Sequence, residues 1–249
     1  MPDQVFENPR LTAIYDSFDG SREDLNNYLE IAKELKAKSV LDIGSGTGCF
    51  ASLLSQHNFN VVGLEPAQAS LKIAQQKPYA DRVNWILGDS SNLSGIKVDL
   101  AIMTGNVAQV FIEDKHWEET LVNIRKSLHT GGHLVFEVRD PKQKAWLEWN
   151  RNSTYKKINV PSIGNVEAWC EVTNVSKELV SFRWTYIFES DGKVITSDST
   201  LRFRDKDTII KSLAKSGYTI NDIRDAPDRP GKEFVFVASC PKIEQKSEE

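Results

Sequence analysis

Apolar residues in the first 140 positions alternate between two patterns, the spacing of an amphipathic helix and the short continuous run of a buried strand. Between residues 23 and 38 they fall on one helical face, at Leu25, Tyr28, Leu29, Ala32 and Leu35. Short apolar runs predict five buried strands, at SVLDIG, NVVGLEP, VNWILGD, VDLAIMTG and HLVFEV. Helices are expected between strands, at GCFASLLSQH, from Ala67 to Gln76 and from Lys115 to His129. Strands joined by helices favour a parallel, doubly wound sheet with right-handed crossovers.

The rhythm changes to a period of two after Pro141. In LVSFRWTYIFES, large apolar side chains occupy every second position from Val180 to Phe188. The pair Asp191 and Gly192 then predicts a hairpin turn into KVITSDSTLRF. Together with VEAWCEVTNV, these runs predict a three-stranded antiparallel meander between about residues 151 and 204.

The last third of the chain returns to the first pattern. Asp207 is expected to cap a helix that ends at Gly217, and YTINDIR and EFVFVASC to form two closing strands. The whole pattern predicts an α/β fold. Its core is a doubly wound, mainly parallel, seven-stranded Rossmann-like sheet, with the antiparallel β meander inserted at residues 141–204.

The composition is that of an ordinary globular protein, with 249 residues of which 40% are hydrophobic. Cys49, Cys170 and Cys240 lie far apart, so neither a disulfide framework nor a cysteine-based metal site is expected. No apolar run approaches the roughly 18 residues of a membrane helix, and MPDQVFENPR lacks the features of a secretory signal. These observations predict a cytoplasmic protein without membrane contact.

Charge gives little support to a nucleic-acid partner. The net charge of −4 provides no general attraction to phosphates. One locally basic stretch exists, and we interpret it as solvated surface in preference to a phosphate-binding patch: Lys142, Lys144, Arg151, Lys156 and Lys157.

Three glycines at every second position follow the first predicted strand. The stretch VLDIGSGTGCF has the form D-x-G-x-G-x-G, from Asp42 through Gly44, Gly46 and Gly48. Such a turn lets the backbone approach a small ligand closely. A dinucleotide fingerprint counted from Gly44 needs a third glycine at position 49, which is Cys49. Gly48 is expected to serve the packing of a helix on a strand in preference to a ligand contact.

Acidic residues follow the next two predicted strands. Glu65 comes about 20 residues after the glycine turn, where a carboxylate can accept hydrogen bonds from both ribose hydroxyls of a nucleoside. This position serves NAD and S-adenosylmethionine (SAM) equally. Asp89, in ILGDSSNL, follows the third strand. The carboxyl ends of these strands form the edge at which open α/β sheets bind ligands.

With these three motifs in order, the sequence resembles the class I SAM-dependent methyltransferases, and most closely their bacterial small-molecule branch. The resemblance implies SAM as the cofactor, with the ribose held by Glu65 and the adenine amino group by Asp89. The cofactor-binding residues that it implies are Asp42, Gly44, Gly46, Glu65, Asp89, Ser90 and Asn106. An NAD-dependent oxidoreductase, which has no particular need of Asp89, is the alternative within this fold.

Residues that could meet the acceptor follow the fourth and fifth strands. Asn106 and Gln109, in TGNVAQVF, could contact the methionine end of SAM or the acceptor. Arg139 and Asp140 are placed to orient an acceptor or take its proton, or else form an exposed helix start. Tyr15 has two interpretations as well: by resemblance a tyrosine of an N-terminal segment often lines the methyl site, whereas the alternative is packing of the first helix.

The resemblance divides the chain into three parts. Residues 1–22 are expected to form an N-terminal cap segment, and residues 23–140 with 205–249 the SAM-binding domain. Residues 141–204 are expected to be an insert that forms a substrate cap.

The expected acceptor is a small molecule methylated at nitrogen or oxygen. The chain lacks both the Asn/Asp-Pro-Pro-aromatic motif after the fourth strand and the Pro-Cys nucleophile of cytosine methylation. Two alternatives stay open: an RNA or protein methyltransferase that uses the basic stretch, and a SAM-binding module without turnover. An exposed edge of the meander could also pair with a second copy to give a homodimer.

Overall fold

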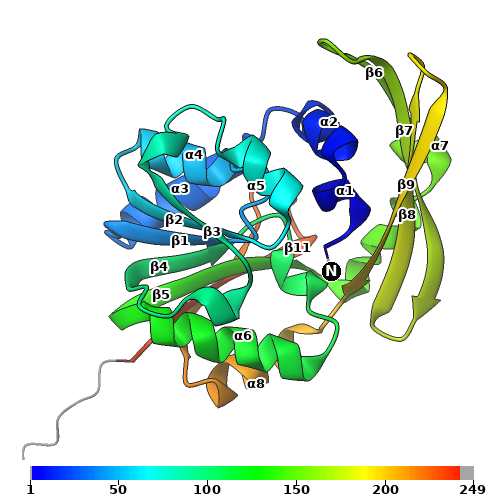
Figure 1. The fold of residues 1–249 in the computed structure, drawn as a ribbon. Helices are drawn as coiled ribbons and strands as arrows, with labels where there is room; N and C mark the ends of the chain where they lie inside the picture. The colour runs from blue at the N-terminus through cyan, green and yellow to red at the C-terminus, as the bar shows by residue number, and fades with distance from the viewer. Residues whose placement is uncertain (1, 242–249) are drawn as a thin grey trace, which may run out of the picture.

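Two β-sheets run through the structure, a computed structural model that describes residues 2–241 (Figure 1). The larger sheet has the strand order β10-β11-β5-β4-β1-β2-β3. Strands β1 to β5 are parallel, whereas β11 pairs antiparallel with both β5 and β10. The predicted doubly wound, mainly parallel seven-stranded sheet is confirmed. Its strands are β1 (Ser39–Ile43), β2 (Asn60–Glu65), β3 (Val83–Leu87), β4 (Val98–Met103), β5 (Leu128–Arg139), β10 (Thr219–Asp225) and β11 (Glu233–Ser239).

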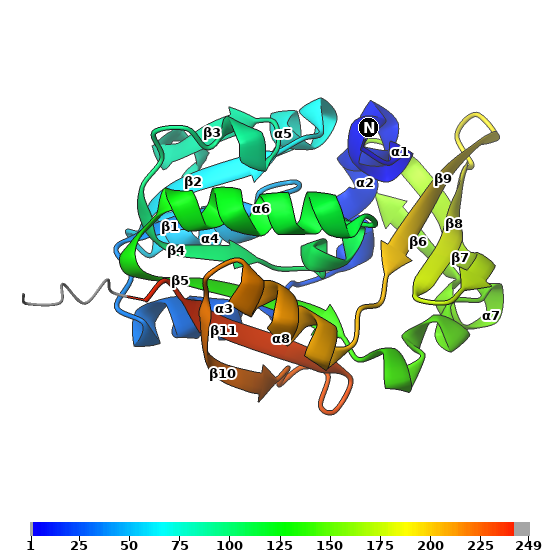
Figure 2. The ribbon, with the colours of Figure 1, turned by 90° about the horizontal axis from the view of Figure 1, so that it is seen from below.

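Helices cover both faces of this sheet (Figure 2). On one face, α3 (Leu25–Glu34) and α4 (Cys49–Gln56) pack in a core that includes Val40 of β1. On the other, α6 (Asp114–Ser127) and α8 (Lys206–Lys215) pack in a core that includes Leu41. Neighbouring residues of β1 therefore face opposite cores, which explains why the central strands read as continuous apolar runs. Helix α5 (Gln68–Ala74) lies beside β2 and β3.

The smaller sheet is antiparallel and has four strands, so the predicted three-stranded meander is wrong by one strand. The additional strand is β6 (Lys156–Val160), at the edge of the sheet, where only Val160 is buried. Its polar residues hide the alternation that revealed the other three strands. These are β7 (Gly164–Ser176), β8 (Leu179–Phe188) and β9 (Lys193–Arg202).

Two further differences concern short segments. The side chain that caps α8 is Asp205, which accepts a hydrogen bond from the Thr208 amide at 2.7 Å, and not the predicted Asp207. Between β5 and β6 lie short helices: η4 (Pro141–Gln143), η5 (Ala145–Glu148) and α7 (Arg151–Thr154). The predicted range 205–249 ends with residues 242–249, which lie outside the described residues.

The N-terminal segment forms two helices that share a core with the smaller sheet. Helix α1 (Gln4–Glu7) is followed by α2 (Pro9–Asp19), which begins with a proline and is capped by the side chain of Asn8. We call α1, α2 and β6–β9 the accessory unit. The side chains that share its core are Val5, Leu11, Ile14, Val160, Val166, Ala168, Tyr186 and Phe188.

Polar contacts also tie the helices of the accessory unit to its sheet. Arg10 of α2 pairs with Asp191 of the β8–β9 turn at 2.7 Å. The Lys156 ammonium donates to the Phe18 carbonyl at 3.0 Å. Segments more than 130 residues apart in the sequence thus form one packed body.

Within residues 2–241, no helix combines the length and the apolar character that a membrane crossing requires.

Gly48 gives a test of the packing between the glycine turn and its neighbours. A Cβ at this position would lie 2.7 Å from Ala74 Cβ and 3.0 Å from Trp85 Cη2, on a backbone with φ of +82°. We therefore expect Gly48→Ala to lower the free energy of unfolding by about 2–4 kcal/mol, from backbone strain and overpacking together. Urea denaturation measures the change.

Gly95→Ala is the matched control. Gly95 has nearly the same φ, +81°, but a Cβ there would meet nothing within 4 Å. It isolates the backbone strain, which is roughly 1–2 kcal/mol. Equal losses in the two variants would show that the packing around Gly48 contributes nothing.

Candidate active site

The glycine turn after β1 is shaped by left-handed backbone and by hydrogen bonds to β2. Gly44 and Gly46 have φ values of +67° and +55°. The amides of Gly44 and Ser45 both donate to the Leu64 carbonyl, at 2.9 and 3.0 Å. A Cβ on Gly44 would collide with Val107 at 2.7 Å, whereas the nearest atom to a Cβ on Gly46 is 4.0 Å away. The backbone at Gly46 therefore leaves open space that a ligand can enter.

Glu65, at the end of β2, holds the glycine turn from beneath. Its carboxylate accepts the Gly46 amide at 2.8 Å and the Ala67 amide at 2.9 Å, one on each oxygen. Burial raises the pKa of Glu65, although these two bonds act in the opposite direction. Each oxygen keeps the capacity to accept a further hydrogen bond.

Asp42, the first residue of the glycine motif, is 1% exposed, and its Oδ2 atom has no hydrogen-bond partner. Burial, with a further contribution from the charge of Glu65, raises the pKa of Asp42 to about 7. Ser45 Oγ is likewise buried and unpartnered. The turn thus contains polar atoms that have no hydrogen-bond partner among residues 2–241.

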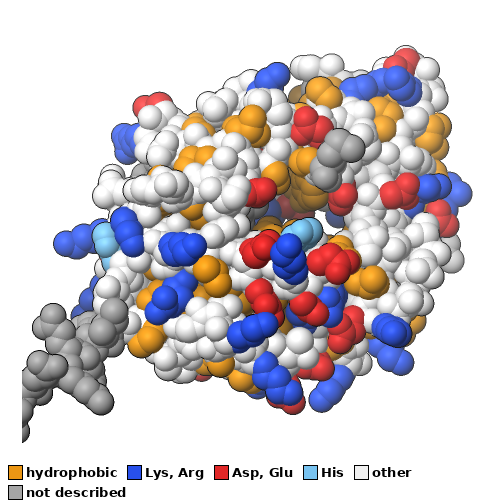
Figure 3. Space-filling view, turned by 60° about the horizontal axis from the view of Figure 1, so that its bottom comes forward, with side chains coloured by type: hydrophobic (Ala, Val, Ile, Leu, Met, Phe, Trp, Pro, Cys, Tyr) orange, Lys and Arg blue, Asp and Glu red, His pale blue; other side chains and the backbone are white. Residues whose placement is uncertain are grey.

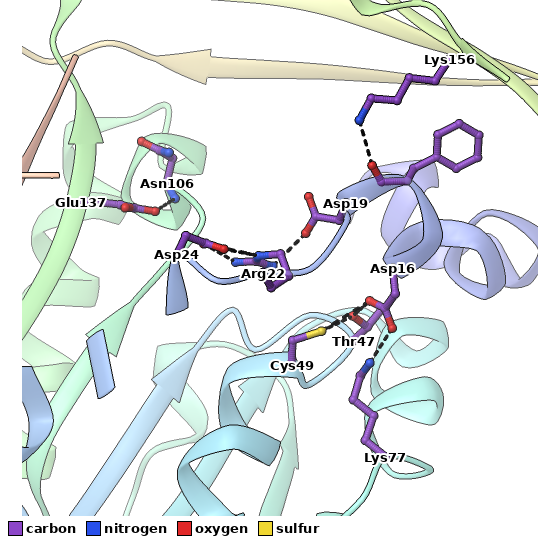
Figure 4. Close-up of polar contacts among 11 residues, drawn as sticks. Asp16, Asp19, Arg22, Asp24, Thr47, Cys49, Lys77, Asn106, Glu137 and Lys156 are labelled. Carbon is purple, nitrogen blue, oxygen red and sulfur yellow. Dashed lines mark hydrogen bonds and ion pairs between the residues drawn. The ribbon is translucent and has the colours of Figure 1, made fainter. Parts of the chain in front are cut away.

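Asn106 lies in the loop that follows the neighbouring strand β4, where it is the N-cap of the short helix η3 (Val107–Val110). It adopts a left-handed conformation with φ of +61°, and its amide donates to Glu137 Oε1 at 3.1 Å (Figure 4). Its side-chain Nδ2 lies 3.4 Å from Glu233 Oε1, whereas its Oδ1 is buried without a partner. Because β1 and β4 are adjacent, Asn106 and the glycine turn stand at the point where the strand order reverses, as ligand sites in such sheets do.

Sequence reasoning missed the two carboxylates behind Asn106. Glu137 on β5 and Glu233 on β11 are each 3% exposed. Glu137 also accepts the Tyr28 hydroxyl, and its pKa is raised by burial and by the nearby Glu233. An acidic residue inside the apolar run HLVFEV was the available signal, but its partners come from three other elements.

Asp89 follows β3 and organises the short helix η2 (Ser90–Asn92). Its Oδ1 accepts the Ser91 amide at 2.8 Å, and hydrogen bonding with Ser91 lowers the pKa of Asp89. The Ser90 hydroxyl instead lies 3.3 Å from Thr120 Oγ1, so this side chain faces α6. The Asp89 side chain thus caps η2, whereas the Ser90 side chain points to α6.

Arg139 ends β5 in a set of polar and aromatic contacts. Its Nη1 donates to Gln109 Oε1 at 3.1 Å, and its Nε lies 3.7 Å from Glu233 Oε1. The guanidinium also lies over the ring of Trp149, 5.5 Å from its centroid. Within residues 2–241, Nη2 of Arg139 makes no hydrogen bond. The neighbouring Asp140 caps η4 by accepting the Lys142 amide at 3.0 Å.

Helix α2 brings Tyr15 and Asp16 to the glycine motif. The Asp16 carboxylate accepts the Thr47 hydroxyl at 2.5 Å, contacts Cys49 Sγ at 3.5 Å and pairs with Lys77 (Figure 4). Tyr15 packs against Phe6 with ring centroids 5.6 Å apart, and burial raises the pKa of its phenol far above the ordinary value. The accessory unit is therefore fastened to the larger domain at the glycine motif itself.

The space-filling view shows an opening between the larger domain and the accessory unit (Figure 3). Acidic and basic side chains and one histidine gather around it. Within residues 2–241, no three His, Cys, Asp or Glu side chains converge as a metal ion would require.

The sheet order and the glycine turn define the class I methyltransferase fold. A family model for a methyltransferase domain matches residues 22–178, which is more than half of the chain. The protein belongs to this family, and SAM is its cofactor, as predicted.

Individual relatives agree with this assignment. The biotin biosynthesis bifunctional protein BioHC of Cellvibrio japonicus (strain Ueda107) is 34% identical over 86 residues, 34% of this chain; the match spans 17% of BioHC. The sugar N-methyltransferase KedS8 of Streptoalloteichus sp. ATCC 53650 has a TM-score of 0.74 and 17% identity, covering 92% of this chain and 93% of KedS8. SAM-bound CalS10, an amino pentose methyltransferase of Micromonospora echinaspora, has a TM-score of 0.68 and 19% identity, covering 92% and 95%.

The residues present fit SAM. Four buried side-chain atoms lack a partner among the described residues, and each can accept a hydrogen bond: Glu7 Oε2, Asp42 Oδ2, Ser45 Oγ and Asn106 Oδ1. SAM carries donors, namely an ammonium group, two ribose hydroxyls and an adenine amino group. Buried acceptors without donors are costly in an empty site and favourable once a donor arrives.

The raised pKa of Asp42 predicts a pH dependence of stability without ligand. Since its folded pKa of about 7 exceeds the ordinary 3.8, the stabilisation is complete below about pH 4 and is lost as pH rises to 7. We expect wild-type stability to fall by up to about 4 kcal/mol from this group, and Asp42→Asn to remove that loss. Urea denaturation at pH 4 to 8 measures both slopes.

The exposed Asp81 supplies the control, because Asp81→Asn should leave the slope of the wild type unchanged. A slope in Asp42→Asn as steep as that of the wild type would contradict the assignment of the pH dependence to Asp42.

Proposed function

We propose that the protein transfers the methyl group of SAM to a nitrogen or oxygen of a small-molecule acceptor. The observation that carries this proposal is the position of the accessory unit. Its helix α2 is bonded to the glycine motif through Asp16, so it stands over the edge of the sheet where the candidate residues gather. The likeness to KedS8, a sugar N-methyltransferase, and to CalS10, an amino pentose methyltransferase, supports an amino group as the acceptor.

This proposal gives each part of the chain a role. Residues 23–140 and 205–241 form the SAM-binding domain, and residues 1–22 and 141–204 form a cap in two segments. Their common hydrophobic core supports treating these segments as one cap. A cap of this kind restricts the acceptor to molecules that fit beneath it.

The residues that we propose to hold SAM come from four strand ends. Gly44 and Gly46 give the backbone close approach, and Glu65 accepts from the ribose hydroxyls. Asp89 is proposed for the adenine amino group, because its carboxylate stands at the end of β3 and is held in place by the Ser91 amide. The unpartnered oxygens of Asp42 and Asn106 suit the ammonium group of the methionine end.

The bound cofactor supplies an electrophilic methyl group, so the chain has mainly to hold the acceptor in line with it. Such positioning is worth about 7–11 kcal/mol. Arg139 suits this task, because Gln109 and Glu233 fix its guanidinium while Nη2 stays available. Tyr15 keeps its proton at neutral pH, so we assign it hydrogen bonding and orientation in preference to base catalysis.

Asp140 is the remaining candidate for the acceptor's proton. An amine acceptor with a pKa near ~10 must lose a proton before it can attack. Asp140 uses Oδ1 to cap η4 and has Oδ2 left, so it can accept that proton or orient the amine. A homodimer stays a separate prediction; the edge strand β6 carries two lysines, which discourage pairing.

The basic stretch has fewer free cationic side chains for RNA phosphates than its sequence suggests. Lys156 donates to the Phe18 carbonyl, and Lys157 pairs with Glu167 and Glu189. Two of its five cations are therefore committed within the protein. This favours the small-molecule acceptor over an RNA methyltransferase.

Mutation of Glu65 and Asp89 tests the cofactor contacts. By calorimetric titration we expect SAM and S-adenosylhomocysteine to bind about 10- to 100-fold more weakly to Glu65→Ala and Asp89→Ala, because each loses a hydrogen bond to a charged group. Asp81→Ala, an exposed carboxylate, is the control and should bind as the wild type does. Unchanged binding in both site variants would refute the assignment.

Transfer of a labelled methyl group tests the acceptor class. SAM labelled on its methyl group is incubated with amino sugars and small alcohols, with bulk RNA and with bulk protein, and the products are separated by size. We expect label in a small product. Label in RNA, with binding that weakens steeply as salt rises, would favour the RNA methyltransferase. SAM binding without label in any fraction would favour the non-catalytic module.

A further inference from the structure

Glu7 differs from the other unpartnered acceptors in its origin. Asp42, Ser45 and Asn106 belong to the larger domain, whereas Glu7 ends helix α1 of the accessory unit. Its Oε2 atom is buried, and within residues 2–241 no lysine or arginine pairs with it. A buried carboxylate oxygen without a partner is unfavourable, and a hydrogen-bond donor on a bound ligand would remove this cost.

Helix α1 lies between the cofactor domain and the smaller sheet (Figures 1 and 2). The Phe6 carbonyl accepts the Ser70 hydroxyl of α5 at 2.8 Å, and the Val5 amide donates to the Ser197 hydroxyl of β9 at 2.9 Å. Since α5 is the helix that follows Glu65, Glu7 is held beside the end of β2. One short helix thus touches both bodies.

Glu7 and Glu65 are close enough for their charges to interact. The charge of Glu7 contributes to the raised pKa of Glu65. Glu65 uses both oxygens on backbone amides, and no cation lies between the two carboxylates among the described residues. Two nearby carboxylates without a donor between them repel each other. A ligand with adjacent hydroxyl groups would satisfy both at once.

We propose that Glu7 accepts a hydrogen bond from a ribose hydroxyl of SAM, and that this bond draws α1 and the accessory unit onto the bound cofactor. The inference rests on the proposed role of Glu65 at the ribose. The ribose would then bridge Glu65 of the larger domain and Glu7 of the accessory unit. Cofactor binding and closure are then coupled, because the closed form keeps two repelling carboxylates unless a donor lies between them.

Binding measurements test the contact. We expect Glu7→Ala to weaken S-adenosylhomocysteine binding about tenfold or more, and Glu7→Gln less, since its amide oxygen still accepts. SAM should show the same ratio, because both ligands carry the same ribose. A larger loss for SAM would mean that Glu7 acts on the sulfonium charge and would overturn the proposal. Gln4→Ala, an exposed change in the same helix, is the control.

Ribose analogues locate the bond. The 2′-deoxy and 3′-deoxy forms of S-adenosylhomocysteine each lack one hydroxyl. For one of them, wild type and Glu7→Ala should bind equally, since the partner of Glu7 is already gone. A Glu7→Ala penalty that persists with both analogues would place the donor elsewhere and refute a ribose contact.

Hydrogen exchange tests the closure. Saturating S-adenosylhomocysteine should slow exchange of the amides of residues 4–19 in the wild type and in Gln4→Ala, but not in Glu7→Ala, and Glu7→Gln, whose amide oxygen still accepts, should lie between them. Binding within twofold of the wild type in both Glu7 variants, or equal protection of residues 4–19, would overturn the inference. If Glu65→Ala also binds normally, the ribose assignment itself has failed; if only the Glu7 variants do, Glu7 alone was misassigned.

Discussion

The site depends on the two backbone hydrogen bonds that the Glu65 carboxylate accepts. This carboxylate accepts one amide from the turn after β1 and one from the turn after β2, so it joins the two loops that we propose to line the cofactor position. Without it two buried amides would lose their acceptor, which costs roughly 1–3 kcal/mol for each group. The left-handed glycines and the start of α5 take their places around this carboxylate. Because the Glu65 carboxylate is buried, water screens it poorly, and the negative charge of Glu7 raises its pKa further.

A second carboxylate network, on β5 and β11, lies behind Asn106. Glu137 and Glu233 fix Asn106 through its amide nitrogens, so that its side-chain oxygen is left for a ligand. Arg139 shares Glu233, and Gln109 holds its other edge. Asn106, proposed for the cofactor, and Arg139, proposed for the acceptor, therefore share one buried carboxylate, Glu233.

Much of the larger domain could be predicted from local sequence. The central strands β1, β2 and β4 and most of β5 are buried and therefore appear as short apolar runs, and the glycine motif is a local backbone requirement. Strand β6 was missed because an edge strand exposes polar residues. Helices α1 and α2 were missed because their apolar partners lie on β6–β8. The roles of Glu137 and Glu233 could be recognised only when β4, β5 and β11 were brought side by side, because the contacts of both with Asn106 join segments more than 30 residues apart.

The core of the accessory unit has a consequence for synthesis of the chain. Leu11 and Ile14 leave the ribosome early, but the strands that bury them end at Arg202. At 5–20 residues per second, about 10–40 s pass before those strands exist. During that interval the apolar face of α2 has no native surface to cover it. The apolar face of α2 therefore stays exposed on the nascent chain until β6–β9 have been made, and its burial is a late event in folding.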